Sequence, residues 1–317
     1  MKIITENRAS VILYNTVVSN NLQDGKILLP ANICPIVPET LFKAKAKLEF
    51  YDINHENFLP DAEILISAIN NTDKISAILY NHTLGFEDKP ENLFKKLKSI
   101  NNEIFIINDC CLTKPKTLLQ DTFADLTLFS TGYSKYVDLG FGGYGFLKKK
   151  HIYRRAKFPF DLNSYKKLVQ NFKVALNSKI KYKYTDSNWL DLNKPKFSTK
   201  EYFDKINSRI IKIEKHKSEL NSLYLKQINK KYHLGEEYNN WRFNILVSNK
   251  DFVLKKIFEA GLFASSHYQS LVGIFGTGEG KNAELLHSQI INLFNDFRFN
   301  TKKALLISDI INKYAEK

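Results

Sequence analysis

The sequence predicts an α/β fold, in which a mostly parallel sheet carries helices on both faces and a smaller α+β domain follows it. Three observations lead to this prediction. Short β-rich apolar runs alternate with helical patterns through the first half, most of these runs are apolar enough to be buried on both faces, and the sequence changes character after about residue 160. We expect a large domain over residues 1–195 and a small C-terminal domain over residues 196–317.

The first half of the chain holds the strands of the expected sheet. Strands are expected at residues 26–30, 47–53, 75–81, 103–109 and 125–130. Between them, apolar residues recur at intervals of three and four, as on amphipathic helices, in residues 34–46, 61–70 and 90–100. Because ligands of such sheets sit at the carboxyl ends of the strands, we expect a functional site at that edge.

The second half of the chain holds the elements of the expected smaller domain. Residues 160–200 are polar and rich in lysine, and no element is predicted there. One long helix is expected at residues 202–228 and a strand at 242–248, with further helices near 251–261, 281–293 and 302–315.

Composition limits the partners and the compartment. The formal net charge of +14 suits an anionic partner, but the basic residues are spread through the chain. No zinc-finger spacing, aromatic RNP pattern or helix-turn-helix signature accompanies them, so we do not expect nucleic acid as a partner. The sequence has no signal-peptide pattern and no apolar run long enough to span a membrane, and its three cysteines, Cys34, Cys110 and Cys111, do not suggest a disulfide framework. We therefore expect a soluble cytoplasmic protein with reduced thiols and no membrane partner.

Polar residues at two strand ends and a glycine-rich loop suggest the chemistry. Asp109 and Ser130 each end an expected strand, and Lys135 follows in residues 130–143, which hold four of the chain's 13 glycines. A lone aspartate at a strand end is usually a cap or turn residue. Together, however, the three residues match what pyridoxal 5'-phosphate needs, namely a lysine for its aldehyde, a carboxylate for its pyridine nitrogen and a hydroxyl for its phosphate.

The order of several segments resembles a known family. The segments are "ILLPANICPIVPETL", "FYDIN", "ILYNHTLG", "IINDCC" and "DLTLFSTGYSKYVDLGFGG". They are similar to segments of the DegT/DnrJ/StrS sugar aminotransferases, which belong to fold type I of the pyridoxal phosphate-dependent enzymes. The spacing also fits, because Asp109 precedes Lys135 by 26 residues and Ser130 precedes it by five. At the other end, "FASSHYQSL" at residues 263–271 resembles the small domain of that family.

The resemblance implies a role for each matching residue. Lys135 would be the Schiff-base lysine and the base that moves the substrate proton, Asp109 would pair with the pyridine nitrogen, and Ser130 would bind the phosphate. A first helix that opens within "ENRAS" falls at the family's phosphate-binding turn. Its candidates are Asn7, Arg8, Ala9 and Ser10.

Two further positions match the family's ring contacts. Cys34 occupies the place where an aromatic residue usually stacks on the cofactor. His82 matches a histidine near the cofactor ring or the subunit contact, although a histidine that caps a strand end would give the same pattern. No metal is expected.

The resemblance also implies an activity. We expect a transferase, an aminotransferase that moves an amino group, with glutamate as donor, to a keto sugar attached to a nucleotide. Such a reaction serves surface polysaccharide or deoxyaminosugar biosynthesis, and the active site would lie at the interface of a homodimer. Two alternatives stay open. The family's partner loop for the sugar nucleotide is not recognisable, which suggests another pyridoxal phosphate reaction such as a decarboxylase or lyase. Altered residues at positions 34, 112 and 132 suggest an inactive member.

Overall fold

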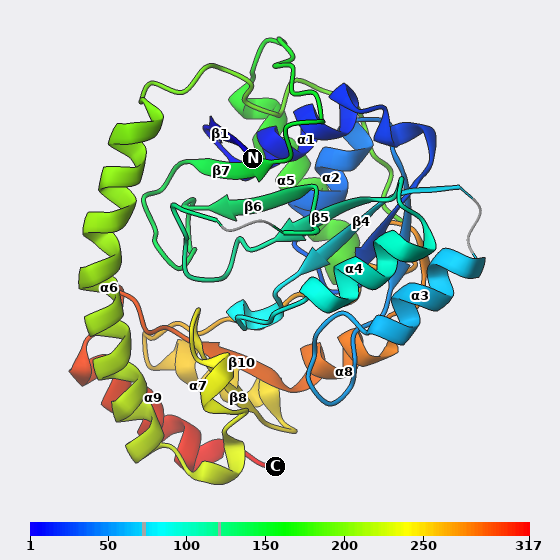
Figure 1. Ribbon diagram of the computed structural model, residues 1–317. Coiled ribbons are helices and arrows are strands. Elements are labelled where there is room, and N and C mark those ends of the chain that lie inside the picture. Colours follow the sequence, from blue (N-terminus) through cyan, green and yellow to red (C-terminus); the bar gives the residue numbers. More distant parts are fainter. Residues whose placement is uncertain (72–73, 120–121) are drawn as a thin grey trace.

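The computed structural model describes residues 1–71, 74–119 and 122–317. Within these residues, one sheet has eight strands in the order β1-β7-β6-β5-β4-β2-β3-β9 (Figure 1). The strands are β1 (Lys2–Glu6), β2 (Lys26–Pro30), β3 (Lys47–Tyr51), β4 (Ile75–Asn81), β5 (Phe105–Asp109), β6 (Leu126–Ser130), β7 (Gly143–Leu147) and β9 (Thr277–Gly278). Pairing is parallel from β6 across to β9, and β7 runs antiparallel to β6 and β1. The predicted, mostly parallel sheet is confirmed.

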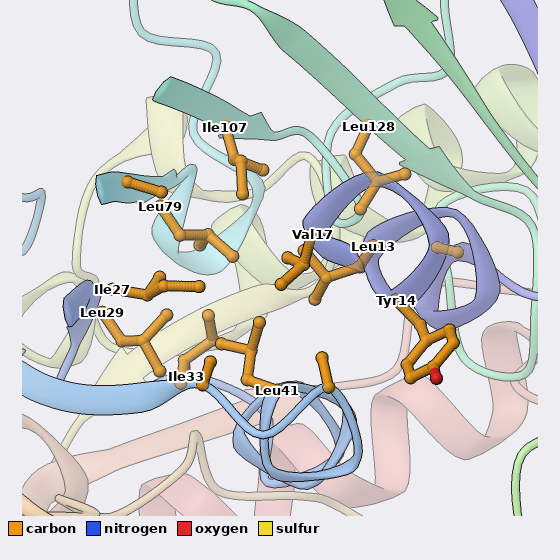
Figure 2. Close-up of a cluster of buried hydrophobic side chains, with 14 of the residues drawn as sticks. Leu13, Tyr14, Val17, Ile27, Leu29, Ile33, Leu41, Leu79, Ile107 and Leu128 are labelled. Carbon is orange, nitrogen blue, oxygen red and sulfur yellow. The ribbon is translucent and has the colours of Figure 1, made fainter. Parts of the chain in front are cut away.

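Helices cover both faces of this sheet. The helices α1 (Ala9–Ser19), α2 (Ile36–Lys43) and α5 (Leu162–Ser178) contribute to one apolar cluster, whereas α3 (Ala62–Asn71) and α4 (Glu91–Ile100) contribute to another on the opposite face (Figure 1). Figure 2 shows the first cluster, in which Leu79, Ile107 and Leu128 of adjacent strands gather with Leu13 and Val17 of α1. Each such buried side chain contributes about 1.5–3 kcal/mol. Because the two clusters lie on opposite faces of the sheet, alternate residues of one strand face different helices.

The C-terminal part of the chain builds a further apolar cluster. It involves α6 (Thr199–Gln227), α7 (Lys250–Glu259), α9 (Thr301–Tyr314) and the antiparallel pair of β8 (Phe243–Leu246) and β10 (Ile290–Leu293). The long helix α6 begins at a capping box, in which Ser198 and Glu201 satisfy each other's backbone N–H groups. Residues of α8 (Lys281–Gln289) instead pack with the first cluster. The division of the chain at residue 195 stays a prediction.

Most of the predicted elements are confirmed within a few residues, but one predicted helix needs correction and some elements were not predicted. The expected helix at 281–293 ends at residue 289, where the chain turns into β10. An isoleucine-rich run is compatible with a helix or a strand. Here pairing with β8 makes residues 290–293 a strand. The strands β1 and β7 and the helix α5 were not predicted.

Among the described residues, no helix combines the length and the apolar character that crossing a membrane requires. In the same part of the chain, no three His, Cys, Asp or Glu side chains group closely enough to hold a metal ion. All three cysteines are free thiols, as the sequence predicts.

Glu39 on α2 predicts a pH-dependent stability. Its side chain is buried, and burial raises the pKa of this carboxyl from 4.5 to about 8, which the nearby Tyr182 opposes only in part. Since the folded-state pKa lies above the ordinary value, the protonated carboxyl stabilises the fold fully below about pH 4.5. That contribution is lost as the pH rises toward 8.

The variant Glu39→Gln stays neutral at every pH and should escape this loss. We expect its free energy of unfolding at pH 8 to exceed that of the wild type by about 2 to 4 kcal/mol, since each unit of pKa shift corresponds to about 1.4 kcal/mol. Urea unfolding at pH 5 and pH 8 measures the difference. Glu103→Gln, at an exposed turn, serves as the control. Equal pH dependence in wild type and Glu39→Gln would contradict the assignment.

Candidate active site

The carboxyl ends of β5 and β6 place two predicted side chains on one face of the sheet. In β5, Ile107 faces α1, so Asp109, two residues further, lies on the same face. In β6, Leu128 faces α1, and Ser130 follows it in the same way. The two strands are neighbours, and Asp109 pairs with Leu128. The sheet therefore brings Asp109 and Ser130 together on the α1 face.

Lys135 lies in the loop that joins β6 to β7. The loop turns back on itself, since the Lys135 N–H donates to the Gly132 carbonyl at 3.4 Å. Cys111 is within electrostatic reach of both predicted catalytic groups. Burial and the Asp109 carboxylate raise the pKa of its thiol, whereas the positive charge of Lys135 acts to lower it. The Cys111 N–H also donates to Asp109 Oδ1 at 2.9 Å, so Cys111 contacts Asp109 directly and is close enough to Lys135 to be influenced by its charge.

Arg8 and Ser130 come together beside the N-terminus of α1. Arg8 precedes this helix in an extended conformation, and no side chain of the described residues caps it. The first N–H groups of a helix lack intrahelical partners and give it a positive end. A Cβ at Gly132 would stand 3.4 Å from Arg8 Nη1 and 3.5 Å from Ser130 Oγ. A guanidinium and a hydroxyl thus flank the same small space, as phosphate binding requires.

Two glycines after Lys135 let this arrangement form. Gly143 pairs with Ser130 across β6 and β7, and a Cβ on it would come within 2.3 Å of the Ala9 nitrogen. Gly142 has a φ of +91°, and a Cβ there would come within 2.3 Å of the Tyr202 hydroxyl. Only glycine fits such close approaches. The glycine cluster therefore brings the start of α1 against the strand that pairs with Ser130.

The predicted residues at the start of α1 play unequal parts. The Asn7 side chain points elsewhere, because its Nδ2 donates to the Asn193 carbonyl at 2.9 Å. Its own carbonyl accepts from the Gly142 N–H at 2.7 Å. Ala9 and Ser10 lie in the first helical turn and offer backbone N–H groups. Of these residues, Arg8 is the one whose side chain flanks the space beside Ser130.

Cys34 lies near Tyr268 from the C-terminal half. Cys34, desolvation of the hydroxyl and Asp109 together raise the pKa of Tyr268. The adjacent His267 is buried, and neither ring nitrogen has a hydrogen-bond partner among the described residues. Burial, His287 and Lys135 lower the pKa of His267 to about 3, so its imidazole is neutral at pH 7. His267 is thus within electrostatic reach of Lys135, and Tyr268 is within reach of Asp109.

The prediction for His82 needs correction. Its ring packs against Tyr80 on the face that α4 covers, opposite to Asp109. Nε2 lies 2.9 Å from Asn108 Oδ1 and Nδ1 lies 3.0 Å from the Phe86 carbonyl, so protein groups engage both nitrogens. The alternative of a histidine that supports a strand end fits this geometry, because side chains alternate between the two faces of a strand.

This protein resembles known proteins in structure rather than in sequence. No family model and no curated protein matches the sequence. A DegT DnrJ EryC1 StrS aminotransferase from Brucella abortus superposes with a TM-score of 0.70 at 14% identity, over 100% of this chain and 87% of that one. A proposed sugar aminotransferase from Streptococcus pneumoniae, in its PMP form, gives 0.71 at 17% identity, over 99% and 87%. DesV from S. venezuelae, in complex with a ketimine intermediate, gives 0.70 at 14% identity, over 99% and 85%.

The chain has the fold of these aminotransferases. The likeness extends over nearly its whole length, which confirms the fold class predicted from the sequence. Within this aminotransferase fold, the sequence did not single out His267 or Tyr268. Both come from the segment after residue 260 and reach the site only through tertiary packing. The signal that existed was the short resemblance of residues 263–271, which carried no role for a single side chain.

Proposed function

We propose that this protein is a pyridoxal phosphate-dependent aminotransferase that moves an amino group from glutamate to a keto sugar carried on a nucleotide. The observation that carries the proposal is the convergence of an amine, a carboxylate and an anion cradle at one edge of the sheet. Lys135 supplies the amine, Asp109 the carboxylate, and Ser130 with Arg8 the cradle. The fold shared with known aminotransferases supports it.

The residues present fit this cofactor. When bound, pyridoxal phosphate supplies an aldehyde that captures amines and a ring that accepts electrons. Asp109 would hold a proton on the pyridine nitrogen, because a carboxylate favours the charged form of a nearby base. Arg8, Ser130 and the first N–H groups of α1 would bind the phosphate. Cys34 and Tyr268 would contact the ring.

Lys135 would have two tasks. Its amine would hold the cofactor through the cofactor's aldehyde, and when it is not so engaged it would act as a base. As a base it would move a proton from the substrate Cα, which amino-group transfer requires. The neutral imidazole of His267 adds no positive charge near Lys135 at pH 7.

A basic cavity supports an anionic substrate such as a nucleotide-linked sugar. It has a volume of about 790 Å³, within the range of small-molecule sites, and adjoins the start of α1. Its charged lining comprises Arg8, Asp191, Lys194, Lys196 and Lys205, and two phenylalanine rings, Phe141 and Phe197, lie 5.3 Å apart beside them. Four cations against one carboxylate favour a diphosphate, and the rings offer a surface for a base.

We also propose that two copies assemble and that the protein acts in the cytoplasm. Tyr133, two residues before Lys135, is 69% exposed, and several apolar side chains of residues 158–165 are also exposed. Such side chains near a site suit a second subunit that covers them. The three free thiols suit a reducing compartment.

The glutamate half-reaction tests the proposed function. Protein loaded with pyridoxal phosphate should convert stoichiometric glutamate to 2-oxoglutarate and lose its visible absorption band. A keto sugar nucleotide should then restore the band. Binding of the cofactor without reaction toward any amino donor would favour a decarboxylase or lyase instead. Failure to bind the cofactor would favour an inactive member of the fold.

A further inference from the structure

The loop that carries Lys135 contains a residue in a costly conformation. Ser134 has a φ of +60°, in the left-handed region that residues other than glycine rarely adopt. Such conformations persist only where surrounding contacts determine them. Because Ser134 immediately precedes Lys135, whatever holds its backbone also sets the direction of the lysine side chain.

Contacts from two sides hold this peptide. On one side, the Ser134 N–H donates to Asp138 Oδ2 at 2.9 Å, and the Gly140 N–H donates to the other oxygen of Asp138 at 2.9 Å. On the other side, the buried Trp241 indole Nε1–H donates to the Ser134 carbonyl at 2.7 Å. Both backbone polar groups of the strained residue are therefore bound.

These contacts are anchored in the C-terminal part of the chain. Arg298 donates to Asp138, and its Nη1 lies 2.5 Å from Asp296 Oδ2. Asp296 in turn pairs with the buried Arg242 at 2.9 Å. The guanidinium of Arg298 thus links the Lys135 loop to a buried ion pair whose members both lie more than 100 residues after Lys135 in sequence.

A buried lysine fixes Trp241 and contacts the loop at a third point. Lys217 on α6 donates to the Trp241 carbonyl at 2.8 Å and to Asn295 Oδ1 at 2.7 Å. Its amine also lies 4.9 Å from the ring centre of Tyr136, the residue after Lys135. The residues on both sides of Lys135 therefore contact side chains of the C-terminal part, Ser134 through Trp241 and Tyr136 through Lys217.

We propose that Trp241 and Arg298 are positioning residues for Lys135, in that they clamp the strained Ser134 turn and so set where the Lys135 amine points. The inference rests on the proposed function for what the amine does. The clamp itself is a property of the protein without cofactor. Movement of the C-terminal part would consequently move the Lys135 loop with it.

Hydrogen exchange of the cofactor-free protein tests the clamp. Trp241→Phe keeps an aromatic ring and removes the indole N–H. Amides of residues 131–142 should then exchange about threefold to tenfold faster, as expected for the loss of one hydrogen bond. Trp189→Phe is the matched control, because the buried Trp189 indole donates to Tyr184 at 3.4 Å, outside this loop. Unchanged exchange in Trp241→Phe, or equal acceleration in the control, would overturn the proposal.

Two further readouts separate positioning from general destabilisation. Ser134→Gly, added to Trp241→Phe, should slow the exchange again, because glycine adopts this φ without strain. Acetylation of Lys135 by acetic anhydride, followed by peptide mass spectrometry, should be faster in Trp241→Phe and Arg298→Gln and unchanged in Trp189→Phe. An unchanged rate in the first two variants would refute the positioning role. Neither readout needs the cofactor. The positioning role can therefore be confirmed if the proposed function is wrong, and it can be refuted if the proposed function is right.

Discussion

Replacing Lys135 with alanine is expected to abolish covalent capture of pyridoxal phosphate and to lower amino-group transfer by about 10⁴-fold, since both the bond to the cofactor and the base for the Cα proton are lost. The visible absorption band should be absent after incubation with cofactor. Turnover of glutamate with a keto sugar nucleotide measures the loss.

Lys149→Ala is the control for this variant, because Lys149 is an exposed lysine 14 residues further along the chain. It should retain the band and the activity. Full activity in Lys135→Ala would show that another amine does the chemistry, and the assignment of the loop between β6 and β7 would then be wrong.

Asp109→Asn is expected to separate cofactor capture from turnover. The amide is nearly the same size as the carboxylate and should still accept the Cys111 N–H, so the site should form and the band should appear. A neutral amide cannot hold a proton on the pyridine nitrogen, and we expect turnover to fall by at least about 100-fold. Single-turnover kinetics with glutamate measure the step. Asp309→Asn, on the exposed side of α9, should leave the rate unchanged.

An equal rate in Asp109→Asn and wild type would contradict the role of this carboxylate. A variant that fails to capture the cofactor at all would instead point to a structural role for Asp109 at the end of β5.

The strands that carry the site could be predicted because the local sequence determines their structure. The strands β4, β5 and β6 are short apolar runs that are buried on both faces, and such runs have few other structures open to them. Each run ends in a polar residue at the edge where ligands bind. Asp109, Ser130 and Lys135 could therefore be placed from spacing and from resemblance together.

The elements that were missed lack this local signal. Only Leu168 and Ala175 of α5 are buried, so its apolar periodicity is weak although Asp161 caps its first turn. The strand β7 contains two glycines, which are unfavourable in strands and are present because α1 and β6 approach closely. The end of α8 was missed because pairing with β8 makes Ile290–Leu293 a strand.

The remaining contacts of the site depend on tertiary structure. His82 could not be assigned to a face of the sheet until the alternation of β4 was known. Trp241, His267 and Arg298 lie more than 100 residues from Lys135, and no spacing in the sequence relates them to it.

The measurement that tests the account most directly is identification of the residue that bonds the cofactor. Wild-type protein is loaded with pyridoxal phosphate, reduced with borohydride, digested and analysed by peptide mass spectrometry. We expect one reduced cofactor, on the peptide that contains Lys135. Reduced cofactor on any other lysine, or no modified peptide from protein that has visibly bound the cofactor, would contradict it.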